Sequence, residues 1–255
     1  MAKQHVVILG LSANPPHVGH KSLTMFLADM EIFDGVLVLP VFKHMFAEKR
    51  IEQVEHSRSP SFDDKLEMCR LGLATPKVTV SDVERSIFNQ KVLDQKSLSN
   101  SVDVDTSKIR VNTADVLNYL KSTQPDTTFH FTMGGDVYQD LCSGKWSRTS
   151  EIRELLCDDS VSNSDSNKSQ SKLHVVERVG DDSTSGEVLK KLVDSENAKG
   201  SKFGLRANLY SVSNLTSVSS SKIRATTDYS VLLTLVSPPV AEYIKEKGFY
   251  GLSSS

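Results

Sequence analysis

Short apolar runs alternate along this chain with segments in which apolar residues recur every three or four positions. Apolar runs typical of strands occupy His5–Leu9, Val36–Pro40, Lys77–Ser81, Thr128–Met133, Leu173–Glu177 and Ala207–Val212. Helical spacing occupies Gly19–Met30, Phe62–Ala74, Thr113–Ser122, Thr149–Cys157 and Pro238–Gly248. This alternation predicts βαβ units, and therefore an α/β fold with a mainly parallel sheet and helices on both faces. Ligands of such sheets bind outside the carboxyl ends of the strands.

Three polar segments interrupt the pattern, near 90–108, 158–172 and 181–202. The second of them, DDSVSNSDSNKSQSK, has Val161 as its one apolar residue. Segments of this composition cannot bury enough apolar surface to offset the entropy of ordering. We therefore expect a single domain over residues 1–255 that carries the three segments as disordered insertions. Within the third, Gly186–Asp194 has the spacing of a short helix.

Composition and charge exclude several classes of protein. With a net charge of −2 over 255 residues, a strongly basic nucleic-acid binder and a polybasic membrane-surface protein are both excluded. No apolar run approaches the length of a membrane span, and the first residues lack a signal-peptide pattern. Cys69, Cys142 and Cys157 are scattered and form neither a disulfide framework nor a metal-binding pair. We expect a cytoplasmic protein, with a nuclear location also open.

The first apolar run leads into a loop, GLSANPPHVGH, that spans Gly10 to His20 and is followed by helical spacing. A loop that leaves a strand and opens a helix is a natural anion site, because its N–H groups point outward and the helix dipole favours negative charge. His17 and His20 lie three positions apart and share one face of the first helical turn. Two imidazoles in this place suit a phosphate that gains charge during a reaction.

Other interpretations of this loop are weaker. It lacks the G-x-G-x-x-G pattern of dinucleotide sites and the G-x-x-x-x-G-K-[ST] pattern of P-loops. The His17 and His20 pair could be half of a metal site, but no further Cys or His lies at ligand spacing, so we expect no protein-bound metal.

The loop resembles the HxGH signature of the α/β nucleotidyltransferase superfamily. A second segment, Ser219-Ser220-Ser221-Lys222-Ile223-Arg224, resembles the superfamily's ISSTxIR motif, and it lies in the expected order near the end of the chain. The resemblance implies a Rossmann-like HxGH nucleotidyltransferase fold. Leu11 and Ala13 depart from the usual Gly and Phe of the first motif.

Further segments resemble the nicotinamide and nicotinate mononucleotide adenylyltransferases within this superfamily. Gly134-Gly135-Asp136, with Trp146 ten residues later, is similar to the family's GxD…W pattern. The segment around Phe62 resembles its F-x-x-R-x-x-M helix, with Lys65 in the place of the usual Arg. Similar matches occur at Lys43, at Val80–Glu84, at Thr113, at Arg178 and in the closing segment Pro239–Tyr250.

The resemblance implies an enzyme of NAD biosynthesis, an adenylyltransferase that joins ATP and nicotinate or nicotinamide mononucleotide to give the dinucleotide and pyrophosphate. His17, His20 and Arg224 would be its catalytic residues, and Mg²⁺ would arrive with ATP. The implied ATP contacts are Gly10, Leu11, Ser12, His17, His20, Gly134, Asp136, Ser219, Ser220, Ser221 and Arg224. The implied mononucleotide contacts are Asn14, Lys43, Thr113, Trp146 and Arg178. Because the attacking phosphate is already an anion, alignment and charge neutralisation suffice without a general base.

Several alternatives stay open. Thr113 has a second interpretation as a helix N-cap, and Trp146 as an aromatic of the core or an interface. The protein could instead be another HxGH enzyme, a phosphopantetheine adenylyltransferase or a cytidylyltransferase. It could also be a non-catalytic nucleotide-binding protein with the same fold. We expect ATP and a pyridine mononucleotide as partners, with no nucleic acid and no membrane, and the sequence leaves a homo-oligomer open.

Overall fold

A parallel sheet organises the protein. The computed structural model describes residues 3–42, 59–99, 104–157, 171–179, 183–199, 204–213 and 218–252. The described strands are β1 (Gln4–Leu11), β2 (Gly35–Pro40), β3 (Val78–Val80), β4 (Thr127–Gly134), β5 (Leu173–Val179) and β6 (Asn208–Ser213). They form a sheet in the order β3-β2-β1-β4-β5-β6. The pairs β1–β4, β4–β5, β5–β6 and β2–β3 all run parallel, as the strand–helix alternation predicts.

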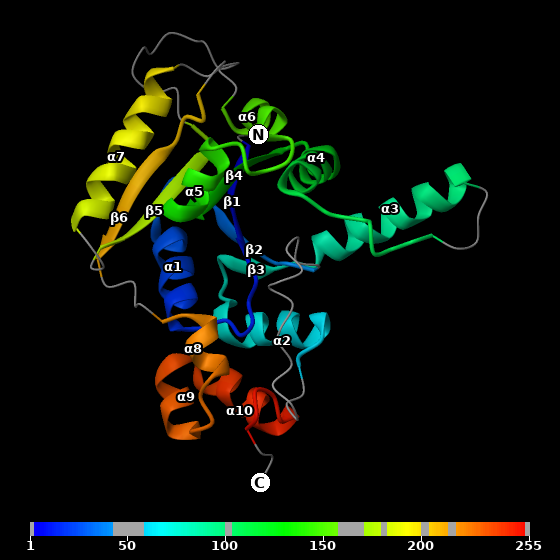
Figure 1. Cartoon of the computed structure of the whole chain (residues 1–255), viewed down its shortest axis with the longest axis vertical. Coiled ribbons are helices and arrows are strands. Elements are labelled where there is room, and N and C mark those ends of the chain that lie inside the picture. Colours follow the sequence, from blue (N-terminus) through cyan, green and yellow to red (C-terminus); the bar gives the residue numbers. More distant parts are fainter. Residues whose placement is uncertain are drawn as a thin grey trace. The chain divides into compact units, whose positions relative to one another are not determined.

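Helices fill the connections between the strands (Figure 1). They are α1 (Val18–Asp29), α2 (Phe62–Leu73), α3 (Val83–Ser99), α4 (Thr113–Thr123), α5 (Gly135–Cys142), α6 (Thr149–Leu156), α7 (Ser183–Ala198), α8 (Ser220–Arg224), α9 (Tyr229–Leu235) and α10 (Pro238–Lys247). Every residue of β4 from Phe129 to Met133 is buried. Because successive side chains of a strand point to opposite faces, a run of buried residues means that both faces are covered. The expected α/β fold is confirmed.

The chain divides into two compact units. Unit 1 comprises Met1–Leu9 and Asn112–Leu215, and unit 2 comprises Gly10–Val111 and Thr216–Ser255. Unit 1 holds most of β1, with β4, β5, β6 and the helices α4 to α7. Unit 2 holds the loop after β1, with β2, β3, α1 to α3 and α8 to α10.

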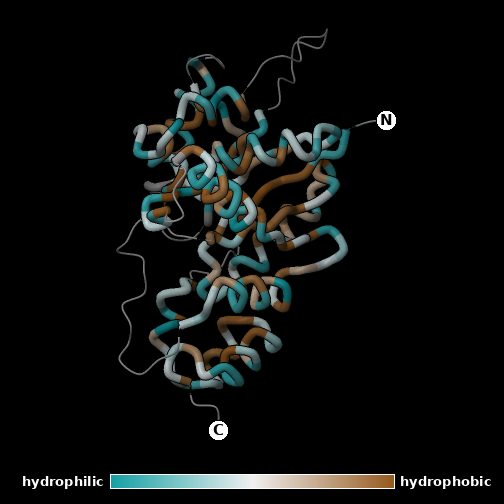
Figure 2. Tube along the Cα trace, turned by 90° about the vertical axis from the view of Figure 1, so that its right-hand side faces the viewer, coloured by the Kyte–Doolittle hydropathy of each residue, from teal (hydrophilic) through white to brown (hydrophobic). Residues whose placement is uncertain are grey.

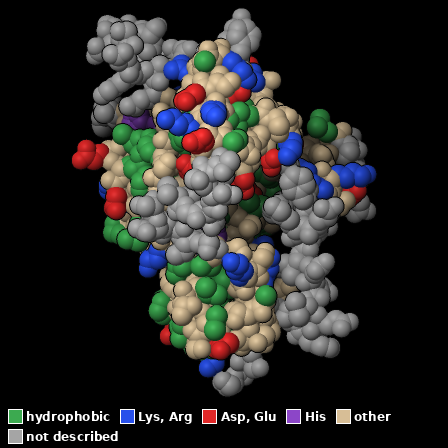
Figure 3. Space-filling view, turned by 60° about the vertical axis from the view of Figure 1, so that its left-hand side comes forward, with side chains coloured by type: hydrophobic (Ala, Val, Ile, Leu, Met, Phe, Trp, Pro, Cys, Tyr) green, Lys and Arg blue, Asp and Glu red, His purple; other side chains and the backbone are tan. Residues whose placement is uncertain are grey.

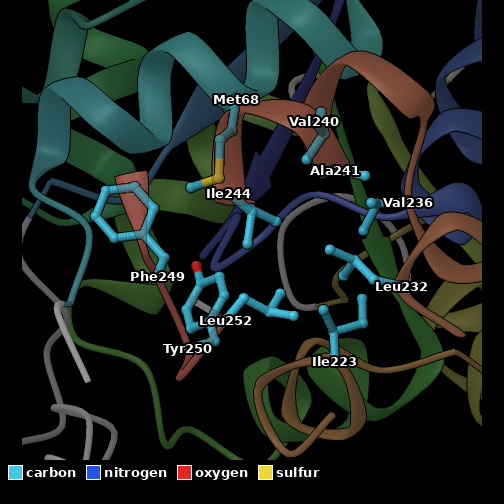
Figure 4. Close-up of a cluster of buried hydrophobic side chains, with 10 residues drawn as sticks. All are labelled: Met68, Ile223, Leu232, Val236, Val240, Ala241, Ile244, Phe249, Tyr250 and Leu252. Carbon is cyan, nitrogen blue, oxygen red and sulfur yellow. The ribbon is translucent and has the colours of Figure 1, made fainter. Parts of the chain in front are cut away.

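In unit 2 an apolar cluster joins α2 to the C-terminal helices. Its buried members, shown in Figure 4, are Met68, Ile223, Leu232, Val236, Val240, Ala241, Ile244, Phe249, Tyr250 and Leu252. Helix α2 begins at a capping box, in which the Ser61 hydroxyl accepts from the N–H of Asp64 and the Asp64 carboxylate accepts from the N–H of Ser61. Helix α10 begins with two prolines and ends at Gly248, which is left-handed with φ 65°.

In unit 1 the helices pack in pairs beside the strands. A side chain at Gly135 of α5 would meet Leu189 of α7 at 2.5 Å, so the glycine allows these two helices to approach closely. Asn118 of α4 donates to Glu151 of α6 at 2.6 Å. The hydroxyl of Tyr138, in α5, donates at 2.6 Å to the carbonyl of Leu205, which lies shortly before β6. These contacts join α5 to α7 and α4 to α6, and they hold α5 to the segment that leads into β6.

Two of the three polar segments differ from expectation. Residues 90–99 belong to α3, and residues 183–198 form α7, so the prediction of disorder is wrong for these parts. The short helix expected at Gly186–Asp194 is confirmed as the middle of α7. Both helices expose polar faces to solvent, and Gln90 donates to Asp94 one turn later in α3. Residues 158–170 lie outside the described part of the chain.

Polar and apolar residues alternate along the whole described trace. Brown hydrophobic stretches are interrupted by teal hydrophilic ones in Figure 2. On the face drawn in Figure 3, Lys and Arg side chains lie among Asp and Glu, in agreement with the net charge of −2. No helix among the described residues is long and apolar enough to cross a membrane.

Candidate active site

The loop between β1 and α1 has an unusual and well-packed backbone. Ala13 is left-handed, with φ 50°, and the bond between Asn14 and Pro15 is cis. The side chains of Ala13 and Asn14 are buried, whereas Gly10 and Ser12 are exposed. A non-glycine residue in this region of backbone space persists only when its surroundings determine it. The loop is therefore a built structure rather than a loose connection.

The two histidines of the loop lie against each other at the start of α1. Their ring centroids are 3.7 Å apart with an interplanar angle of 25°, and His17 is 5% exposed. His17 is the N-cap residue, and its backbone N–H donates to Nδ1 of His20 at 3.2 Å. This bond requires an unprotonated Nδ1, so the neutral ring of His20 carries its proton on Nε2. The predicted sharing of one helical face is confirmed, and it occurs at the positive end of the helix dipole.

The SSSKIR segment packs directly on this loop. Ile223 is buried in the cluster of Figure 4, and this anchors α8. The hydroxyl of Ser220 donates to the carbonyl of Pro15 at 2.9 Å, and Arg224 donates to the carbonyl of Asn14 at 2.8 Å. A second guanidinium nitrogen of Arg224 donates to the Ser221 hydroxyl at 3.0 Å. These two hydrogen bonds join residues that are 205 and 210 positions apart in the sequence. The structure thus brings the two motifs together.

Ser219 starts α8 in the way its sequence suggests. It is the N-cap residue, and its hydroxyl accepts from the N–H of Lys222 at 3.3 Å. The hydroxyls of Ser219, Ser220 and Ser221 therefore all have partners within this segment or the loop.

Lys65 was not among the predicted site residues. Its ammonium group nevertheless interacts electrostatically with the guanidinium group of Arg224. Burial lowers the pKa of Lys65, and the Arg224 charge lowers it further. Within the described residues, no carboxylate forms an ion pair with either cation. Two cations held near each other favour an anionic ligand. The sequence signal was present, because Lys65 occupies the position of a basic residue in the family pattern.

Tyr250 is the second residue that sequence reasoning missed. Its hydroxyl donates to Oδ1 of Asn14 at 2.6 Å, across 236 positions of sequence. Nothing in the local pattern around Tyr250 indicates this contact.

In unit 2, Glu84 holds the chain just after β2. Its carboxylate accepts from the N–H of Phe42 at 2.9 Å. Burial raises the pKa of Glu84 to about 7, and the hydrogen bond from Phe42 opposes that rise. The next residue, Lys43, is a predicted mononucleotide contact and lies outside the described part of the chain. Glu84 therefore holds the backbone at Phe42.

In unit 1, the predicted nucleotide contacts of the GGD segment lie where β4 ends and α5 begins. Gly134 is the N-cap of α5, and an added side chain there would meet the Asp136 carboxylate at 2.8 Å. Asp136 is exposed in the first turn of α5. This is the carboxyl end of a parallel strand, where ligands bind in such sheets.

Thr113 and Trp146 also lie in unit 1. The N-cap of α4 is Asn112, whose side chain accepts from the N–H of Asp115 at 3.1 Å, and Thr113 is the first helical residue. The interpretation of Thr113 as a cap is therefore wrong. Trp146 is half-buried, and its carbonyl accepts from the Thr149 hydroxyl at 2.8 Å.

Arg148 connects the turn that contains Trp146 to α4. It contacts Asp115 at 2.5 Å and Glu151 at 2.6 Å, and it is left-handed, with φ 61°. Arg178 belongs to β5, the strand next to β4.

The described residues contain no group of three or more His, Cys, Asp or Glu side chains that could hold a metal ion. Cys69, Cys142 and Cys157 are free. Burial raises the pKa of Cys69 to about 12, so its thiol is an inert part of the core.

A parallel α/β sheet, a histidine pair at the start of α1 and a serine–arginine segment bonded to the same loop are the features that the resemblance to the α/β nucleotidyltransferases predicts. No family model matches the chain. Over 153 residues it is 26% identical to a probable nicotinate-nucleotide adenylyltransferase of Anaeromyxobacter dehalogenans, a match that covers 60% of this chain and 67% of that protein. The corresponding protein of Myxococcus xanthus is 25% identical over 150 residues, 59% of this chain and 64% of its own. The chain is related to the nicotinate-nucleotide adenylyltransferases.

Solved structures support the fold. The nicotinic acid mononucleotide adenylyltransferase of Plasmodium falciparum, complexed with APC, has a TM-score of 0.61 at 17% identity and covers 99% of this chain and 100% of its own. The same enzyme complexed with NaAD has a TM-score of 0.57 at 18% identity, with the same coverage. At such identities the likeness is one of fold.

Proposed function

We propose that this protein joins the 5′-phosphate of nicotinate or nicotinamide mononucleotide to the α-phosphate of ATP and releases pyrophosphate. One observation carries the proposal. Ser220 and Arg224 are hydrogen-bonded to the carbonyls of Pro15 and Asn14, so the serine–arginine segment lies on the histidine loop. The kinship with nicotinate-nucleotide adenylyltransferases supports this choice of substrates over those of other nucleotidyltransferases.

In the proposed reaction, an oxygen of the mononucleotide phosphate forms a bond to the α-phosphorus of ATP. The bond from that phosphorus to the bridging oxygen breaks, and pyrophosphate leaves with the electron pair. Both the nucleophile and the leaving group are stable anions, so the protein needs to supply alignment and positive charge. No covalent enzyme intermediate is required.

We assign the ATP phosphates to unit 2. His17 and His20 donate hydrogen bonds from the start of α1 to the α-phosphate as it gains charge. Arg224 offers its remaining N–H groups to the β- and γ-phosphates, supported by Ser219, Ser220 and Ser221. Gly10, Leu11 and Ser12 line the approach of the nucleotide to the end of β1. Mg²⁺ enters as the ATP complex, held chiefly by phosphate oxygens.

The remaining contacts are assigned by the family pattern. Gly134 and Asp136 contact the adenosine, with the Asp136 carboxylate on ribose hydroxyls. For the mononucleotide, Trp146 stacks on the pyridine ring, and Lys43 binds the phosphate. Asn14, Thr113 and Arg178 complete the proposed contacts.

The test is a direct synthesis. In separate reactions, the full chain is incubated with MgCl₂, ATP and one of three acceptors: nicotinate mononucleotide, nicotinamide mononucleotide or phosphopantetheine. A further reaction contains MgCl₂, CTP and choline phosphate. Chromatography against authentic dinucleotides and a pyrophosphate assay measure the products. Dinucleotide from either pyridine mononucleotide supports the proposal, and the ratio of the two rates reports acid or amide preference. A folded protein, by circular dichroism, that makes neither dinucleotide overturns it.

A further inference from the structure

Asn14 receives hydrogen bonds from two different C-terminal segments. Its carbonyl oxygen accepts from Arg224 at 2.8 Å, and its side-chain Oδ1 accepts from the Tyr250 hydroxyl at 2.6 Å. Both Asn14 and Tyr250 are buried, with exposures of 7% and 6%. Charged and neutral donors thus hold the same loop residue from two sides, three positions before His17.

Tyr250 is itself held firmly in place. After Gly248 ends α10, Tyr250 and Gly251 are both left-handed, with φ 57° and φ 78°. This turn places the ring of Tyr250 among the side chains of the apolar cluster, between Phe249 and Leu252 (Figure 4). A left-handed conformation at a bulky residue is maintained only when packing determines it. The hydroxyl is therefore presented from a fixed position.

The Tyr250 hydroxyl acts as a donor at every working pH. Burial raises the pKa of this phenol far above its ordinary value, and the Asp64 and Cys69 charges add to the rise while Arg224 opposes it. A donor bound to Oδ1 determines which end of the Asn14 amide faces the ring. Among the described residues no hydrogen bond uses Nδ2 of Asn14, so within this part of the chain the second donor has no competing acceptor.

We propose that Tyr250 is a positioning residue of the active site, which orients the Asn14 amide and the loop in front of His17 so that Nδ2 is presented to a phosphate of the bound substrates. This inference rests on the proposed function for the identity of those phosphates. Tyr250 touches no reacting atom, and it acts only through Asn14.

The first test is Tyr250→Phe, which removes one oxygen and keeps the ring in the cluster. Tyr243→Phe is the matched control, because the Tyr243 hydroxyl also donates to a single side chain, Asp64, at 2.8 Å in the same unit. We expect kcat/KM for dinucleotide synthesis to fall about tenfold in Tyr250→Phe, the effect of one lost hydrogen bond to a buried group, and less than about threefold in Tyr243→Phe. Equal losses in the two variants would overturn the proposal.

A double-mutant cycle separates positioning from a general loss of stability. If Tyr250 acts through Asn14, then Tyr250→Phe in an Asn14→Ala background should lower kcat/KM by less than about twofold. Full additivity of the two losses overturns the proposal, because it means that Tyr250 acts by another route. Thermal melting of wild type, the two single variants and the double variant identifies an assay temperature at which all four proteins are folded.

A binding measurement tests the role of Tyr250 separately from the proposed function. Absence of dinucleotide in the wild-type reaction would overturn the proposed function alone. Calorimetric titration with α,β-methylene-ATP and with nicotinate mononucleotide then decides on Tyr250. We expect Tyr250→Phe to raise Kd for at least one of these ligands by about fivefold or more, with Tyr243→Phe unchanged. Unchanged Kd values for both ligands in Tyr250→Phe would sink the inference.

Discussion

Two groups of histidines in this protein use the same side chain in opposite ways. In unit 2, His17 and His20 lie after the carboxyl end of β1, stacked at the start of a helix. In unit 1, His5, His130 and His174 come from the adjacent strands β1, β4 and β5 and form a hydrogen-bonded row. Nδ1 of His5 is 3.0 Å from Nε2 of His130, and Nδ1 of His130 is 2.9 Å from Nε2 of His174.

Burial alone does not distinguish the two groups. His17 is 5% exposed, and His130 and His174 are 4% and 1% exposed. The difference lies in their position along the strands. The row occupies the first halves of its strands, where neighbouring rings are hydrogen-bonded to each other. At one end of the row, Tyr210 of β6 stacks on His174. The pair lies at the carboxyl end, where helix dipoles and loop N–H groups favour anions. We therefore assign chemistry to the pair and stability to the row.

The largest expected effect tests the pair. His17→Ala removes one proposed donor to the phosphate that gains charge, so kcat for dinucleotide synthesis should fall about 10²–10³-fold. The free energy of unfolding should fall by only about 1 kcal/mol, because a single ring at the start of one helix is lost. Steady-state kinetics and urea unfolding measure the two quantities. Near-normal kcat in a folded His17→Ala protein would contradict the assignment.

The reverse result is expected for the row. His130→Phe keeps the ring shape but leaves His5 and His174 without their shared partner. The free energy of unfolding at pH 8 should fall by about 2–3 kcal/mol, since buried polar groups lose hydrogen bonds. Below its melting temperature the variant should retain kcat within about twofold of wild type. A loss of kcat without a loss of stability would break the comparison, because it would place the row in the reaction.

The pH dependence of stability sharpens the same contrast. Burial lowers the pKa of His130 to about 3, helped by the His174, His5 and Lys172 charges, and burial lowers that of His174 to about 4. Because both values lie below the ordinary 6.5, the fold favours the neutral rings. Their contribution is complete above pH 6.5 and is lost as pH falls toward 4 and 3.

Urea unfolding from pH 8 to pH 4 measures this loss. Below pH 6.5 the slope should approach about 1.4 kcal/mol per pH unit for each of the two histidines. His130→Phe should have the shallower slope, because one titrating ring is absent. Equal slopes in the two proteins would show that other groups govern acid unfolding.

The same features show which parts of the fold and of the candidate site could be predicted from the sequence. The strands, the HVGH loop and the SSSKIR segment were predictable, because their information is local: apolar runs, a histidine spacing, a serine-rich helix start. Helices α3 and α7 were missed in part because their exposed polar faces resemble insertions. The bond from Tyr250 to Asn14 could not be predicted, since it joins residues 236 positions apart through packing of the C-terminal turn. The histidine row has the same cause, because three strands must be paired before its members meet.

A last test concerns Glu84, where burial acts on a carboxyl group and shifts its pKa in the opposite direction. Burial raises the pKa of Glu84 to about 7, so the fold favours its neutral form. That contribution is present below pH 4.5 and is lost as pH rises through 7.

Glu84→Gln keeps an acceptor for the Phe42 N–H and cannot ionise. The free energy of unfolding of the variant should therefore exceed that of wild type by up to about 3 kcal/mol at pH 8, and by less than about 1 kcal/mol at pH 5. Urea midpoints at the two pH values provide the measurement, and a variant less stable than wild type at pH 8 would mean that the charged carboxylate is needed to hold the segment after β2. In combination with His130→Phe the two changes should act on separate limbs of the profile, the acid limb from unit 1 and the alkaline limb from unit 2.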